Sequence, residues 1–289
     1  MALWRRIAIT PVFLLSLSAG SGETSLCAGF IPENDMQIPV TALNVGGVTQ
    51  SEFNEVLDKV ENYYAPIIQS RGARLNVNRD WNSPTVNASA TRSGGTYTIN
   101  MYGGLARHHT MTKDSFMLVA CHELGHHIGG APKVGSWRGD WASNEGQADY
   151  FANLRCMRFL LGSEDNSKWA KETTVDPVLQ RRCEEMYSSQ PEEYLCMRLG
   201  MAGLAGASLF HEMREEQTPL RFDTPDSNQV SRTFDGHPAT QCRLDTYFQG
   251  GLCFHNMEQP LSDQNPDQGT CSERNGQRDG LRPRCWFRP

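Results

Sequence analysis

The sequence predicts an α+β protein that is mainly helical, with one small antiparallel β-sheet and a cysteine-rich loop tail. Three observations lead to this class. Several long stretches carry apolar residues at three- and four-residue spacing, short alternating segments lie between residues 74 and 102, and a polar C-terminal segment holds two cysteines. The 289 residues, 38% of them hydrophobic, are enough to bury a core.

The composition indicates which partners the protein can bind and in which redox compartment it folds. A formal net charge of −6 creates no basic field for a polyanion, so we expect no nucleic-acid partner. Nine cysteines are many for a chain kept in a reducing compartment, and they indicate an oxidising one.

The N-terminal residues are typical of a secretory signal peptide. Basic residues at 5 and 6 precede a mostly apolar stretch over 7–17, and small residues follow at 18–22. We therefore expect a signal peptide over 1–20, a main domain over 21–255 and a cysteine-rich tail over 256–289. No later stretch reaches the length of a membrane span, so no integral membrane segment is expected in the mature chain, which would be secreted or periplasmic.

The first half of the chain is expected to combine one helix with the sheet. Residues 51–70 carry an apolar stripe at helical spacing. Alternating segments follow at 74–79, 85–90 and 96–102, and the last two are separated by a turn at Gly94-Gly95, which predicts an antiparallel sheet.

The second half is expected to be helical. Thr112 begins a helix that Gly129-Gly130 ends, and Ser143 begins another that runs to about Leu161. Further helices are expected over 177–187, 192–216 and 238–250.

The segment His122-Glu123-Leu124-Gly125-His126 is the strongest functional signal. Positions i and i+4 share one helix face, so both imidazoles can bind one zinc ion while Glu123 lies beside a water on that ion. His127 points elsewhere and is expected to pack rather than bind metal. The alternative is a surface helix with three histidines.

A third ligand is expected at Glu145, in Asn144-Glu145-Gly146-Gln147-Ala148-Asp149. A catalytic zinc commonly takes three protein ligands and keeps one position open. Asp149 lies one helical turn later and could accept the second ring N–H of a zinc histidine. The alternative is that both acids only stabilise the helix N-terminus.

These residues resemble the gluzincin metallopeptidases, and in particular peptidase family M forty-eight, which includes CAAX prenyl proteases and bacterial membrane-stress proteases. Val86-Asn87-Ala88 is similar to the family's Asn-Ala segment, and His237-Pro238 followed by Arg243 is similar to its His-Pro element. The resemblance implies a zincin-like fold with one zinc ion per chain. It also implies that His237 faces the site, where it would act in catalysis by stabilising the transition state or would block the metal at rest, and that Arg243 holds the acidic residues around the ligands. The alternative is that Pro238 only begins a helix.

The expected activity is zinc-dependent hydrolysis of a peptide or protein substrate, with Glu123 as the general base. Tyr97, Ile99 and Met101 are expected to lie on a sheet edge that aligns an extended substrate. An endopeptidase is favoured over an aminopeptidase, because a Gly-x-Met-Glu-Asn element is missing. A catalytically silent zinc-binding chaperone or binding module of the same fold is the alternative from another class.

The sequence does not determine which cysteines pair, because eight paired cysteines alone allow 105 connectivities. Cys121, next to His122 on a buried helix, is expected to be an unpaired core residue. Cys271 and Cys285 are expected to form a local bridge in the tail.

Overall fold

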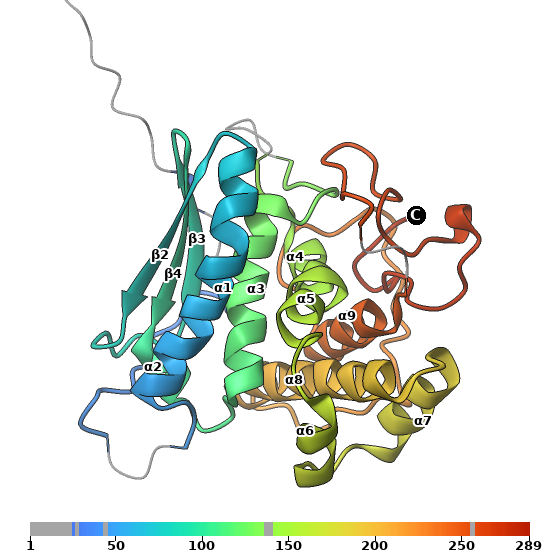
Figure 1. The fold of residues 1–289 in the computed structure, drawn as a ribbon, viewed down its shortest axis with the longest axis horizontal. Coiled ribbons are helices and arrows are strands. Elements are labelled where there is room, and N and C mark those ends of the chain that lie inside the picture. Colours follow the sequence, from blue (N-terminus) through green and yellow to red (C-terminus); the bar gives the residue numbers. More distant parts are fainter. Residues whose placement is uncertain (1–24, 27–28, 43–45, 136–140, 255–257) are drawn as a thin grey trace, which may run out of the picture.

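The structure is a computed structural model that describes residues 25–26, 29–42, 46–135, 141–254 and 258–289 (Figure 1). The signal peptide expected over 1–20 lies outside these residues, as does Cys27. In the described part of the chain, no helix has both the length and the apolar character needed to cross a membrane.

The chain is α+β, as the sequence predicts. Figure 1 shows the sheet on one side of the molecule, helices α1 and α3 beside it, and the later helices with the C-terminal tail on the other side. Helix α1 packs against strand β2 and helix α3 against strand β3, so the largest cluster of buried apolar side chains lies between the sheet and these helices.

The sheet is mixed rather than antiparallel, which corrects the prediction. Its order is β1-β3-β4-β2, with β1 at Ser25–Leu26, β2 at Arg74–Asp80, β3 at Ala88–Ser93 and β4 at Thr96–Tyr102. Strands β3 and β4 form the expected hairpin, but β2 pairs with β4 in parallel. Strand β3 runs opposite to β2, and the β3–β4 hairpin reverses the direction again, so β4 lies between the two and runs parallel to β2.

Helix α1 spans Gln50–Ser70 and confirms the predicted apolar stripe. Thr49 caps it through a capping box, in which its hydroxyl accepts from the backbone N–H of Glu52 while the Glu52 carboxylate accepts from the N–H of Thr49. The stripe faces the core, and the buried side chains are Phe53, Val56, Leu57, Val60, Tyr64 and Ile68.

Helix α3 spans Lys113–Ile128 and begins after Thr112, as predicted. The next helical stretch also ends at Leu161 as predicted, but it consists of α4 at Glu145–Phe151, a π-helix at 152–157 and α5 at Arg158–Leu161. Its cap is Asn144, not Ser143, because the Asn144 side chain accepts from the backbone N–H of Gln147.

The three later predicted helices are present with shifted ends, as α7 at Pro177–Met186, α8 at Gln190–Met213 and α9 at Thr240–Leu252. Helices α2 at Gly103–Arg107 and α6 at Asn166–Glu172 were not predicted, because stretches of five and seven residues are too short for an apolar period to stand out. The tail contains a 3-10 turn at Glu273–Asn275.

Four disulfides correct both cysteine predictions. Cys121 is bonded to Cys156, so it is not an unpaired core residue, because the π-helix packs directly against α3. Cys271 and Cys285 do not bond to each other. The tail folds back over α9 instead, and the remaining bridges are Cys183–Cys196, Cys242–Cys285 and Cys253–Cys271.

Candidate metal centre

His122 and His126 lie on one face of α3, one turn apart. Their Nε2 atoms are 3.1 Å from each other, and the two rings are nearly perpendicular, with 89° between their planes. Both side chains are fully buried. Two imidazole nitrogens therefore meet at one point inside the protein.

Glu145, the first residue of α4, supplies a carboxylate to the same point. Its Oε2 lies 3.3 Å from Nε2 of His122, and its Oε1 lies 3.7 Å from Nε2 of His126. Close packing of α3 on α4 permits this approach, since a Cβ added at Gly125 would lie only 3.0 Å from the Cα of Ala148. His122, His126 and Glu145 form a buried group that could hold a metal ion.

The second nitrogen of each ring is fixed by a hydrogen bond. Nδ1 of His122 donates to Oδ1 of Asp149 at 2.7 Å, and Nδ1 of His126 donates to the carbonyl of Ser143 at 2.8 Å. With Nδ1 committed as a donor, Nε2 of each ring faces Glu145, and in the neutral ring this nitrogen carries the lone pair that a metal ion would take. This is the tautomer that a metal-binding histidine requires.

Asp149 is held by a buried network around one carboxylate oxygen. Besides His122, Oδ1 accepts from Nη2 of Arg243 and from the hydroxyl of Tyr247, both at 2.6 Å. Burial would raise the pKa of Asp149, but the charges of Arg243 and His122 outweigh it and hold the pKa at about 2. Asp149 is therefore ionised and fixes the orientation of His122.

The protonation state of each ligand side chain depends on the charges of the others. Burial lowers the pKa of His126 to about 4, which leaves its ring neutral. Burial also acts to lower the pKa of His122, but Asp149 and Glu145 outweigh it and raise the pKa to about 9. For Glu145, burial acts to raise the pKa, and the neighbouring His126 and His122 lower it overall. Without a metal ion, the His122 ring supplies the positive charge that balances the carboxylates.

Glu123 is fully buried, and neither of its carboxylate oxygens has a hydrogen-bond partner. Burial raises its pKa to about 8, and the neighbouring Glu145 adds to the effect. Burying a carboxyl group that makes no hydrogen bond costs folding free energy, unless a ligand or a water molecule bonds to it. Its position beside the three ligand side chains fits a site that holds a cation.

His237 and Arg243, the residues implied by the His-Pro resemblance, both lie at this centre. Nε2 of His237 is 3.5 Å from Oε2 of Glu145, and it also lies 2.7 Å from the carbonyl oxygen of Gly29. The His237 side chain is 12% exposed. The α9 residue Arg243 contacts Asp149, and His237 lies next to Glu145 with a more exposed side chain than the three ligand candidates.

The predicted substrate edge is wrong. Strand β4 pairs with β3 on one side and β2 on the other, so it is an interior strand without a free edge. Ile99 and Met101 are fully buried in the core. Tyr97 stacks on His127 and lies under the guanidinium of Arg92.

His127 packs as predicted. Its Nε2 lies 3.1 Å from the carbonyl oxygen of Thr98, and its ring stacks between Tyr97 and Trp141. Burial lowers its pKa to about 3, so the ring is neutral.

Sequence reasoning missed three participants. Tyr247 follows Arg243 by four residues, so helical periodicity could have placed both on one face of α9. The Ser143 carbonyl and Phe30 had no such signal, since one is a backbone group and the other is distant in sequence. Phe30 packs edge-on against His122, with ring centroids 5.1 Å apart, and its carbonyl accepts from Nη1 of Arg243.

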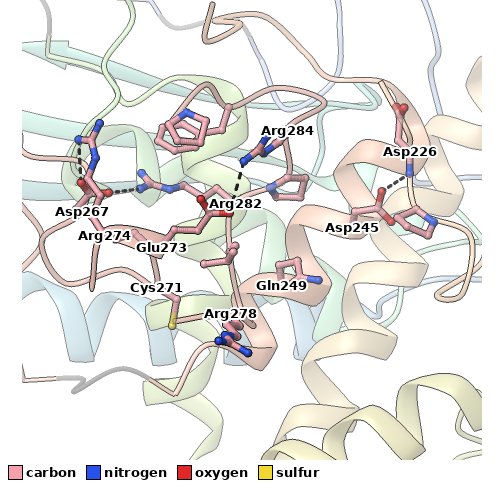
Figure 2. A pocket seen from close by; sticks show the side chains of 16 residues that line it. Asp226, Asp245, Gln249, Asp267, Cys271, Glu273, Arg274, Arg278, Arg282 and Arg284 are labelled. Carbon is pink, nitrogen blue, oxygen red and sulfur yellow. Dashed lines mark hydrogen bonds and ion pairs between the residues drawn. The ribbon is translucent and has the colours of Figure 1, made fainter. Parts of the chain in front are cut away.

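A separate cavity of about 420 Å³ lies between α9 and the tail (Figure 2). Four arginines and four carboxylate side chains line it, among them Asp245, Arg278 and Arg284. The cavity therefore carries charged side chains of both signs. None of the three metal-ligand candidates lines it.

Comparisons with known proteins do not identify the centre. No protein-family model, curated protein or solved structure matches this chain.

Proposed function

We propose that this chain is a zinc-dependent metallopeptidase of zincin-like fold that cleaves peptide bonds as an endopeptidase. One observation carries the proposal. Two buried imidazoles in the metal-binding tautomer and one carboxylate converge within 3.1 to 3.7 Å, beside a buried glutamate with no hydrogen-bond partner. This combination supports a reactive metal centre better than a structural ion pair.

The donor set favours zinc over other divalent ions. Zinc binds imidazole nitrogen and carboxylate oxygen at about 2.0–2.2 Å in tetrahedral geometry, which places neighbouring ligand atoms about 3.3–3.5 Å apart. The separations among His122, His126 and Glu145 span that value. Calcium and magnesium prefer oxygen ligands, so two imidazoles disfavour them.

When bound, a zinc ion polarises the scissile carbonyl and lowers the pKa of a water molecule. Glu123 then accepts a proton from the attacking water and returns it to the leaving amine. Its raised pKa of about 8 suits the donor half of this cycle, and a bound cation would shift the pKa downward. Asp149 and Ser143 keep His122 and His126 in orientation throughout.

His237 is placed to stabilise negative charge on the substrate carbonyl. Its Nε2 faces the centre beside Glu145, on the side where Gly29 lies. A substrate oxygen would take the place of the Gly29 carbonyl as the partner of this nitrogen. Such a donor contributes when it points to where charge develops in the transition state.

An oxidising compartment is consistent with the chain. Four disulfides join its helices and tail, and bonds of this kind persist outside the cytosol. Together with the predicted signal peptide, they support a secreted or periplasmic protease.

The decisive variant is Glu123→Gln, which keeps the size of the side chain and removes the base. We expect one zinc per chain at the His122 centre and loss of casein hydrolysis by at least about a hundredfold. Glu145→Ala is the companion, and it should lose both the metal at this centre and the activity. Glu55→Gln, an exposed α1 residue, is the control that should keep both. Full activity in Glu123→Gln would overturn the assigned base.

A catalytically silent zinc-binding module is the second candidate, and one observation favours it. The ligand side chains are at most 3% exposed, and the nearby His237 is bonded to the Gly29 carbonyl rather than free to meet a substrate. In that case, zinc-loaded wild-type protein would show no chelator-sensitive hydrolysis of casein or of a mixed peptide library. Hydrolysis that a chelator abolishes and zinc restores would exclude this candidate.

A further inference from the structure

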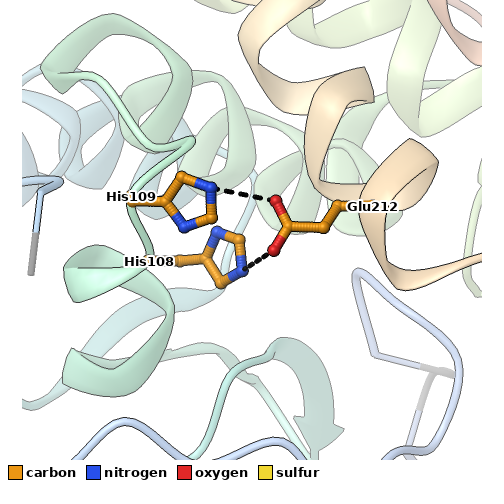
Figure 3. Close-up of side chains that lie close together, drawn as sticks. All are labelled: His108, His109 and Glu212. Atoms are coloured by element: carbon orange, nitrogen blue, oxygen red, sulfur yellow. Dashed lines mark ion pairs between the residues drawn. The ribbon is translucent and has the colours of Figure 1, made fainter. Parts of the chain in front are cut away.

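A second group of ligand-type side chains lies where the turn after α2 meets the C-terminal end of α8 (Figure 3). We propose that His108, His109 and Glu212 form a second metal site, which takes a divalent zinc-like ion. The site is independent of the proposed peptidase function, because it shares no residue with the centre at His122.

The geometry brings three ligand atoms together. Nε2 of His109 lies 2.9 Å from Oε2 of Glu212, and Nε2 of His108 lies 3.8 Å from Oε1. Figure 3 shows both rings directed at the carboxylate. The two imidazoles are stacked with centroids 4.7 Å apart, and all the ligand atoms lie within 4.8 Å of one another. Tetrahedral zinc needs ligand atoms about 3.3–3.5 Å apart, so small side-chain rotations suffice.

The backbone that carries the two histidines is firmly held. His108 ends α2 in an extended conformation, and its carbonyl accepts from the N–H of Met111 at 2.9 Å, which closes a turn. Gly47 packs against this backbone with φ +90, and a Cβ there would lie 2.7 Å from the His108 carbonyl oxygen. The Thr110 hydroxyl lies 2.9 Å from Nδ1 of His108 and orients the ring, so that Nε2 faces Glu212.

The charges around Glu212 favour a bound cation. Glu212 is in the last turn of the 24-residue helix α8, the end at which the helix dipole places partial negative charge. A carboxylate at a helix C-terminus is unfavourable by itself. The guanidinium of Arg214, two residues further on, points instead to the Pro238 carbonyl and the Thr240 hydroxyl. The His108 side chain is buried, so one of the three ligand side chains is held away from bulk solvent.

The ligand set indicates the class of ion. Two imidazoles with one carboxylate suit zinc or a similar transition metal, whereas calcium and magnesium favour oxygen donors. His109 and Glu212 are 61% and 51% exposed, so water can complete the coordination. The ion would join the turn after α2 to α8, and it should bind more weakly than at the buried centre.

The test is a zinc titration of the full chain by calorimetry, with metal content measured in parallel. We expect two ions per wild-type chain and one in His109→Ala and in Glu212→Gln, with the weaker binding step lost. His211→Ala is the matched control, because this neighbouring ring contacts the Thr218 carbonyl and belongs to neither site. It should bind two ions.

A second readout guards against a folding artefact. Zinc added beyond the first equivalent should raise the melting temperature of wild-type protein and of His211→Ala, but not that of Glu212→Gln. The proposal is overturned if Glu212→Gln and His109→Ala bind the second ion with wild-type affinity, or if wild-type protein binds one ion. A His126→Ala variant should keep the weaker ion alone. Two ions in that variant would instead contradict the centre at His122.

Discussion

Nδ1 of His122 lies 2.7 Å from Oδ1 of Asp149, and both side chains are fully buried. The contact joins α3, which carries the two imidazoles, to α4, which carries Glu145. Arg243 extends it to α9 by donating to the same oxygen. Helices α3, α4 and α9 are thereby fixed around one point.

The first prediction concerns Asp149→Asn. The change keeps the volume but removes the charge that orients His122, and losses of such outer partners cost about 10–100-fold in metal affinity. We expect the zinc dissociation constant of the His122 centre to rise by that factor, measured by competition with a chromophoric chelator. Asp245→Asn, a buried carboxyl outside the centre, should leave it unchanged. An Asp149→Asn protein with wild-type affinity would show that Asp149 does not act on the metal.

The second prediction concerns the buried ion pair of Asp149 and Arg243, whose Nη2–Oδ1 distance is 2.6 Å. Arg243→Met leaves Asp149 charged without its cation, and breaking such a pair costs about 3–5 kcal/mol. We expect a fall of that size in the free energy of unfolding, measured with urea. The double variant Arg243→Met, Asp149→Asn should recover part of the loss, and strictly additive losses would exclude the coupling.

The third prediction concerns the disulfide between Cys121 and Cys156, which joins α3 to the π-helix next to His122. Replacing both cysteines by alanine should lower the free energy of unfolding by about 2–4 kcal/mol. Zinc affinity at the His122 centre should fall as well, because the helix that carries both imidazoles becomes less constrained. The matched control is the pair Cys183 and Cys196, where the same replacement should lower stability without changing zinc affinity.

The fourth prediction concerns pH and Asp245, a residue of the separate cavity. Burial raises its pKa from 3.8 to about 6, against hydrogen bonds from the Asp226 N–H and the Gln241 side chain. The protonated form is therefore favoured in the folded state, so this contribution to stability is full below pH 4 and is lost as the pH rises through about 6.

Asp245→Asn should remove this pH dependence. Between pH 4 and pH 7, the free energy of unfolding of the wild type should fall relative to that of the variant, by at most about 3 kcal/mol for the shift involved. Urea unfolding at several pH values measures the difference. Parallel curves for the two proteins would mean that Asp245 titrates normally.

Local patterns predicted most of the helices and strands. The apolar stripe of α1 and the cap of α3 at Thr112 depend on neighbours within a few residues, and both are found as expected. The parallel pairing of β2 with β4 and the four disulfides depend on how segments cross in space. No pattern within about ten residues indicates this strand pairing or these disulfides, and the predictions of an antiparallel sheet and of the cysteine pairing were wrong.

For the candidate centre, the amino-acid sequence by itself determined that His122 and His126 share a helix face, because an i, i+4 spacing is a property of the helix. It also placed Glu145 and Asp149 one turn apart at the start of the following helix. Only the tertiary structure decided that Glu145 comes within 3.3 Å of His122 and that the predicted substrate strand is an interior strand. Such distances follow from how whole helices and strands pack, and packing is set by contacts between residues that are far apart in the chain.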